Sequence, residues 1–253
     1  MELHWSDHLL FLVIGVIIPL RAVLGTQPQL KNMRFSTRMK LQLYWGNNLY
    51  LWLLCGAVVG VWWFNDRPAH LLGLDWPWIW PQGWSMAVMA VFGMLYVWDT
   101  VTEINSQEQR EMTAETMRSE LGFLPQNGKE YFHFIFLALT AGICEEIIFR
   151  GYFIRYFQCL LGTEETYTLA ILLPAVIFGL VHMYQGWHAV VKIGAMAIMF
   201  GYVFVHTNSL WLLIVVHALV DLIGGFLAWR LMVGKEGDNQ NFNQNENQNL
   251  NDM

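Results

Sequence analysis

Apolar segments long enough to cross a bilayer recur along the chain, and they constrain its fold more than any other feature. A membrane-spanning helix needs about 20 predominantly apolar residues, because every backbone polar group in lipid must find its partner within the segment. We count about seven such segments, at 9–24, 44–64, 84–101, 131–152, 167–183, 189–206 and 210–232. The sequence therefore predicts an all-α, polytopic bundle of about seven transmembrane helices.

The composition agrees with a membrane bundle and excludes one class of partner. Apolar residues make up 55% of the 253-residue chain and charged residues only 13%, against about 25% charged in soluble domains. The formal net charge is −6, and no basic surface suggests a nucleic acid as partner. The partner that the composition does predict is the lipid bilayer.

Three regions of the chain differ in character. Residues 1–130 hold the first three apolar segments and a charged stretch, 103–120, which fits a helix on the membrane surface and equally a solvated connecting helix. Residues 131–233 hold the last four apolar segments. Residues 234–253 are mostly Asn, Gln, Glu and Asp and cannot bury enough apolar surface to become ordered. We expect this Asn/Gln-rich tail to be disordered.

The basic residues near the segment ends predict an orientation. Most of them fall on one side of the membrane if the chain crosses it about seven times: Arg21, Lys31, Arg34, Arg38, Lys40, Arg110, Arg118, Lys129, Arg230 and Lys235. Cytoplasmic loops carry an excess of Lys and Arg. We therefore predict an external N-terminus and a cytoplasmic C-terminus.

The fourth apolar segment contains Glu145, Glu146 and Arg150 in a stretch that is otherwise suited to lipid. Each such group costs at least about 2.5 kcal/mol on insertion, so a functional or paired role is the default interpretation. Glu146 and Arg150 are four residues apart on one helical face, which suits an ion pair. Glu145 is turned about 100° away and is free for other chemistry. Taken alone, the three charges are explained equally well as a cluster that holds helices together.

Two later segments each place a histidine four residues from a partner. Phe178 precedes His182 in the fifth segment, and His217 precedes Asp221 in the seventh. A single intramembrane histidine is often only a packing or hydrogen-bonding residue. Asp221, however, could bond one ring nitrogen of His217 while the other nitrogen faces a site. A glutamate pair and two histidines on three helices could converge on a central aqueous pocket.

On these residues the chain resembles the CPBP family, which includes the type II CAAX prenyl endopeptidases and their bacterial relatives, often called Abi proteins. The resemblance rests on an EExxxR pattern starting at Glu145, an FxxxH pattern ending at His182 and an HxxxN/D pattern starting at His217. It implies that residues 131–233 form a CPBP-like catalytic transmembrane core. It also implies a protease of the bacterial plasma membrane that acts on a membrane-associated protein or peptide.

The resemblance implies a role for each matching residue. Glu145 and His182 would activate a water for attack on a peptide carbonyl, and His217 and Asp221 would stabilise the resulting oxyanion. The supporting residues would be Glu146, Arg150 and Phe178.

Asp221 matches the HxxxN/D pattern but departs from its best-studied form, which has Asn at this position. An ionised Asp cannot donate a hydrogen bond to an oxyanion, so we expect Asp221 to orient His217 instead. Family members are also labelled metalloendopeptidases. If a divalent metal such as zinc takes part, Glu145, His182 and His217 would be its three protein ligands. The residues allow either mechanism, and we favour the metal-free one.

The predicted boundaries leave a geometric conflict. Strict alternation places Glu145 and His217 near the outer face and His182 near the inner face, so that they would not meet. Either the fourth segment starts later than 131 and runs on toward Cys159, or the fifth segment is broken near Pro174 and Gly179, which is tolerated where the backbone lines a water-filled cavity.

Three functional hypotheses follow. The first is an intramembrane endopeptidase, whose substrate need not be prenylated. The second is a non-catalytic membrane scaffold or bacteriocin-immunity factor of the same fold. The third is an ion or proton transporter, in which the same buried groups relay protons. Proteolysis yields a cleaved product without an ion gradient, whereas transport yields none.

Overall fold

The computed structural model describes residues 1–25, 35–75, 82–162 and 167–233. The predicted disordered tail, 234–253, lies outside this set.

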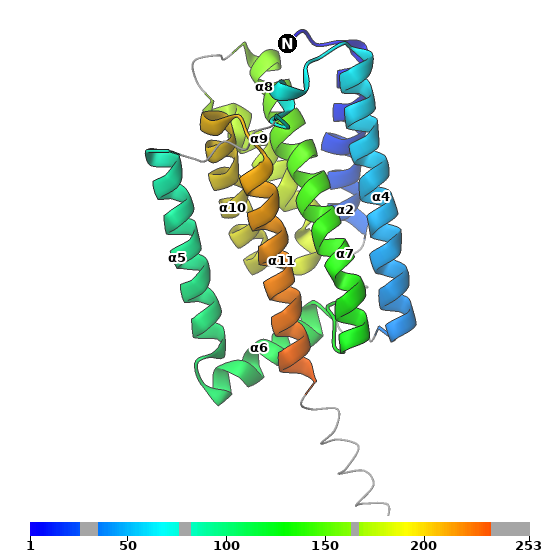
Figure 1. Ribbon diagram of the computed structural model, residues 1–253. Coiled ribbons are helices and arrows are strands. Elements are labelled where there is room, and N and C mark those ends of the chain that lie inside the picture. The colour runs from blue at the N-terminus through cyan, green and yellow to red at the C-terminus, as the bar shows by residue number, and fades with distance from the viewer. Residues whose placement is uncertain (26–34, 76–81, 163–166, 234–253) are drawn as a thin grey trace, which may run out of the picture.

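The described residues form an all-helical bundle (Figure 1), as predicted. Six helical spans are long and apolar enough to cross a membrane, and a shorter apolar helix, α9 (Thr168–Val181), accompanies them. The prediction of about seven membrane helices is confirmed. The six spans are Trp5–Gly25, Thr37–Phe64, Trp84–Ile104, Gly128–Leu161, Trp187–Thr207 and Trp211–Met232.

Two of the spans contain π-helical turns within α-helix. The first span is composed of α1 (Trp5–Leu10), η1 (Phe11–Ile17) and α2 (Ile18–Gly25). The fourth is composed of α7 (Gly128–Glu145), the π-helical η3 (Glu146–Phe153) and α8 (Ile154–Leu161). The other described elements are α4 (Thr37–Phe64), η2 (Ala69–Leu72), α5 (Trp84–Ile104), α6 (Gln107–Glu120), η4 (Met183–Gln185), α10 (Trp187–Thr207) and α11 (Trp211–Met232).

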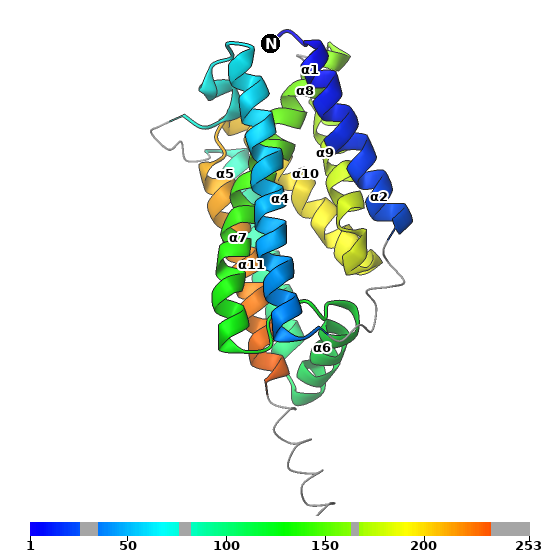
Figure 2. The same ribbon diagram turned by 90° about the vertical axis from the view of Figure 1, so that its right-hand side faces the viewer.

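The long fourth span joins two groups of helices. In Figure 2, α4, α7 and α11 lie together on one side, while α2, α9 and α10 lie on the other. The π-helical η3 contacts α4 as well as α9 and α10. It therefore brings both groups together at the level where the candidate site residues lie.

The fourth span is longer than predicted. We expected it to cover 131–152, but the helix is continuous over 34 residues, as far as Leu161. The expected extension past Cys159 is therefore present, but the expected later start is wrong, because the helix begins at Gly128. The helix α9 is not broken at Pro174; it ends at Val181, so that His182 occupies its C-cap position.

A close approach of α7 and α11 fixes their relative position. A Cβ atom added to Gly142 would lie 3.0 Å from the backbone nitrogen of Ala218 and 3.0 Å from the carbonyl oxygen of Ile214. A side chain here would force the backbone of α11 to move by a few tenths of an ångström, so the absence of a side chain allows this close contact. The contact places the C-terminal end of α7 directly against the residue that precedes Ala218, which is His217.

Buried polar groups tie the N-terminal part of the chain to the fourth span. Nη1 and Nη2 of Arg67 donate to Asp7, at 2.7 and 2.6 Å. The hydroxyl of Tyr152 in η3 donates to the same carboxylate at 3.0 Å. In a second pair, Nζ of Lys40 lies 3.1 Å from Oε2 of Glu130 in α7. Neither pair was predicted from the sequence.

The charged stretch before the fourth span forms α6, which packs against α5 and α11. Figure 1 shows α6 lying across the end of the bundle. Ser106 caps its N-terminus by accepting a hydrogen bond from the backbone of Gln109 at 3.2 Å.

Candidate active site

The site forms where α7 passes into the π-helical η3. Glu145 is the last residue of α7, Glu146 is the first of η3, and both side chains are buried. Because a π-helix has a wider turn than an α-helix, it changes the direction in which successive side chains point, and such segments are frequent at functional sites. Here the change of helix type falls between two adjacent carboxylates.

Glu146 bonds two partners through one oxygen. Its Oε1 accepts a hydrogen bond from Nη1 of Arg150 at 2.9 Å and another from Nδ1 of His217 at 2.7 Å. The predicted ion pair between Glu146 and Arg150 is therefore confirmed. All three residues are at most 3% exposed, so this network is shielded from water.

His217 is oriented by Glu146 and not, as we expected, by Asp221. Oδ2 of Asp221 lies 3.9 Å from Nε2 of His217, beyond hydrogen-bond distance. The reason is the close approach of α7 and α11, which brings Glu146 from the neighbouring helix within reach of Nδ1. The other ring nitrogen, Nε2, then faces Glu145, whose Oε2 lies 3.7 Å away.

His182 lies close to this group at the end of α9. Its Nδ1 donates to the carbonyl oxygen of Phe178 at 2.7 Å, which leaves Nε2 of the neutral ring as an acceptor. The centre of the Phe178 ring lies 4.5 Å from that of His182 and 6.2 Å from that of His217. The guanidinium carbon of Arg150 lies 4.7 Å from the centre of the same ring. Phe178 therefore contacts three of the other predicted residues.

Tyr184 in η4 is a neighbour of the site that sequence analysis missed. Its ring stacks on that of His182, with centres 6.0 Å apart, and its hydroxyl oxygen accepts a hydrogen bond from Nε2 of Gln185 at 3.0 Å. Burial raises the pKa of Tyr184 to about 12, and the charges of Glu145 and Asp221 act in the same direction. The phenol is therefore protonated at neutral pH and able to donate. Its only signal in the sequence is its position two residues after His182.

The predicted metal ligands, Glu145, His182 and His217, lie on α7, at the C-cap of α9 and on α11. Across the described ranges, no three His, Cys, Asp or Glu side chains are grouped closely enough to hold an ion. As placed, Glu145, His182 and His217 do not form the three-ligand site of a catalytic zinc.

The fold and the site together define a polytopic membrane protein with a buried centre of carboxylates and histidines. Residues 127–223 match the family described as Type II CAAX prenyl endopeptidase Rce1-like. This segment contains every predicted site residue, and the match supports the family resemblance that the motifs indicated. The chain is therefore similar, over this segment, to a family of membrane proteases. Comparison with curated proteins and with solved structures gave no match.

Proposed function

We propose that this chain is an intramembrane endopeptidase that hydrolyses a peptide bond in a membrane-associated protein or peptide. The observation that supports this most is the meeting of Glu145, Glu146 and His217 across two helices, within 3.7 Å, inside a segment that matches a protease family. Ionisable groups are rare in membrane helices unless they serve a function.

Glu145 is the proposed base. Oε1 of its neighbour Glu146 already accepts from Arg150 and His217, whereas Oε2 of Glu145 lies 3.7 Å from His217, too far for a hydrogen bond. Glu145 can therefore take a proton from a water molecule whose oxygen attacks the peptide carbonyl carbon. Nε2 of His182 is a second acceptor that holds this water. The proton on Glu145 then passes to the leaving amine, so that the products are a carboxylate and an amine.

His217 and Tyr184 are the proposed donors to the oxyanion. Nδ1 of His217 is hydrogen-bonded to Glu146. When the imidazole of His217 is charged, it therefore donates its other hydrogen bond from Nε2, which lies toward Glu145 and Asp221. An ionised Asp221 cannot donate. The protonated phenol of Tyr184, stacked on His182, supplies the neutral donor that Asn provides in the family pattern. Donors aimed at a developing oxyanion are each worth about 2.7–4 kcal/mol.

We further propose that the mechanism is metal-free. The chain would lie in the bacterial plasma membrane, with an external N-terminus and a cytoplasmic C-terminus. The substrate is defined only by class, and a prenyl group on it is not required by any residue of the site.

The experiment that tests the function compares peptide termini in cells that express wild type or Glu145→Ala at matched levels. The control is Glu115→Ala, which removes an exposed carboxylate of α6. We expect a new terminus in membrane or secreted peptides with wild type and with the control, and none with Glu145→Ala. No difference among the three, with all inserted equally, would favour the alternative function, a non-catalytic scaffold or bacteriocin-immunity factor of the same fold.

A further inference from the structure

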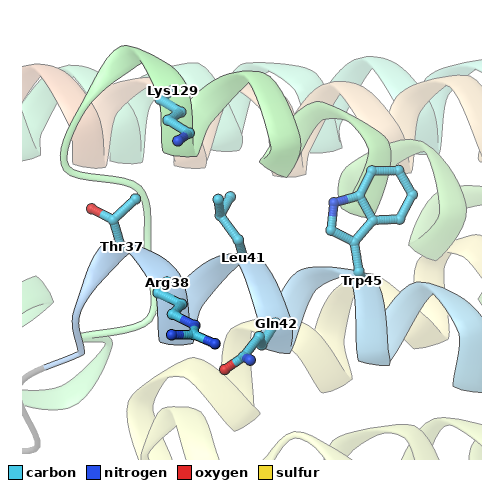
Figure 3. Close-up of a pocket in the computed structure, with 6 residues that line it drawn as sticks. All are labelled: Thr37, Arg38, Leu41, Gln42, Trp45 and Lys129. Carbon is cyan, nitrogen blue, oxygen red and sulfur yellow. The ribbon is translucent and has the colours of Figure 1, made fainter.

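A second site lies between the N-terminal ends of α4 and α7. A pocket of about 570 Å³ opens there, lined by Thr37, Arg38, Leu41, Gln42, Trp45 and Lys129 (Figure 3). None of these residues belongs to the candidate active site.

The pocket carries positive charge that is not neutralised. Arg38 and Lys129 are exposed, and neither has an ion-pair partner among the residues that the structure describes. The carboxylate next to them, Glu130, is buried and fully engaged: it accepts from Oγ1 of Thr37 at 2.6 Å and from Nζ of Lys40 at 3.1 Å. Both helices also begin at the pocket, so their N-terminal dipoles add to the positive potential.

The same pocket has an apolar and aromatic part. Figure 3 shows Leu41 between Lys129 and the pair Arg38 and Gln42, with Trp45 further along α4. The indole of Trp45 is half exposed and donates from Nε1 to Nδ1 of His133 on α7 at 3.2 Å, so that it is fixed across the two helices.

The order of charged and apolar groups along the pocket matches the order of headgroup and acyl chain in a phospholipid. Spacings of three and seven residues from Arg38 place Leu41 and Trp45 on one face of α4, in order from the end of the helix toward the interior of the bundle. Charges therefore lie at the end of two membrane helices and apolar groups lie deeper. Trp side chains prefer the headgroup level of a bilayer.

We propose that this pocket binds an anionic phospholipid, with its headgroup phosphate held by Arg38 and Lys129 and the start of an acyl chain on Leu41 and Trp45. A free phosphate would use the two cations but not the apolar surface, and a neutral lipid would leave the cations unpaired. Basic pockets between membrane helices bind anionic headgroups in this way. The proposal does not depend on the protease function.

The test measures the lipids retained by the purified full chain. Wild type is reconstituted in nanodiscs of phosphatidylcholine and phosphatidylglycerol in equal amounts, released into mild detergent and analysed by native mass spectrometry. The pocket variant is Arg38→Gln with Lys129→Gln. The matched control, Arg21→Gln with Arg230→Gln, removes two exposed cations, one in α2 and one in the last turn of α11, that do not line the pocket.

We expect wild type and the control to retain phosphatidylglycerol preferentially, and the pocket variant to lose this preference on the order of tenfold. Trp45→Ala should weaken retention while leaving the charges in place. Equal retention by wild type and the pocket variant, or an equal loss in the control, would overturn the proposal. Displacement of the lipid by millimolar inorganic phosphate would also overturn it, because the site would then be one for free anions.

Discussion

Replacing Glu146 with alanine tests whether the buried network has the connections described above. The substitution removes the one acceptor shared by Arg150 and His217 and leaves the guanidinium 2% exposed without its counter-charge. Breaking a buried ion pair by removing one partner costs about 3–5 kcal/mol. Because about 1 kcal/mol shifts the midpoint of a chain of this size by about 2–4 °C, we expect the thermal midpoint to fall on the order of 10 °C.

The assay is thermal unfolding of purified protein in detergent, followed by the fluorescence of the 13 tryptophans. Four variants belong in the series: Glu146→Ala, Arg150→Met, the double variant Glu146→Met with Arg150→Met, and Asp99→Ala. The last breaks an exposed ion pair, between Asp99 and Lys192, and should change the midpoint little, since such pairs contribute about 0–1 kcal/mol.

The double variant separates stability from activity. It removes both charges of the pair at once, so that no orphaned charge remains, and it should recover much of the stability that each single variant loses. It should not recover cleavage, because His217 has lost the acceptor that orients it. A midpoint for Glu146→Ala equal to that of wild type, or a double variant less stable than both single variants, would refute this reasoning.

Three further predictions concern activity. Tyr184→Phe should lower the cleavage rate on the order of 10²-fold, as expected when one oxyanion donor is lost, with no change in the amount of folded protein; an unchanged rate would remove Tyr184 from the mechanism. Gly142→Ala should lower both activity and thermal midpoint, because its Cβ would press on the backbone of α11, whereas Gly93→Ala, which meets nothing within 4 Å, should do neither. Cleavage should survive exhaustive treatment with a chelator; loss that zinc restores would contradict the metal-free mechanism.

The sequence was sufficient for features that depend on local spacing. A bilayer requires a long apolar helix for each crossing, so the number of helices could be predicted from hydropathy alone. The pair Glu146 and Arg150 could be predicted because residues four apart share one face of a helix. The three motifs also indicated the family whose model matches residues 127–223.

Features that depend on how helices meet could not be predicted. The bond from His217 to Glu146 joins positions 71 residues apart, and it exists because Gly142 lets α11 approach α7. The pair of Asp7 and Arg67 is of the same kind, with partners 60 positions apart.

The end of the fourth span was predicted too early for a related reason. Arg155 lowers the local hydropathy and suggests a boundary. In the fold, however, its Nε donates to the carbonyl oxygen of Leu71 at 3.0 Å, and its guanidinium carbon lies 5.1 Å from the centre of the Phe204 ring. A charged group that is satisfied by distant residues does not end a helix, and the sequence gives no sign of such partners.

The central claim is that this chain itself hydrolyses a peptide bond with Glu145 as the base. The most direct measurement incubates purified wild type and Glu145→Gln, which keeps the shape of the side chain, with membranes in water enriched in ¹⁸O and no ion gradient. The account predicts new peptide C-termini that carry the ¹⁸O label with wild type and none with Glu145→Gln at an equal amount of folded protein. Labelled termini in equal yield from both proteins, or from neither, would contradict it.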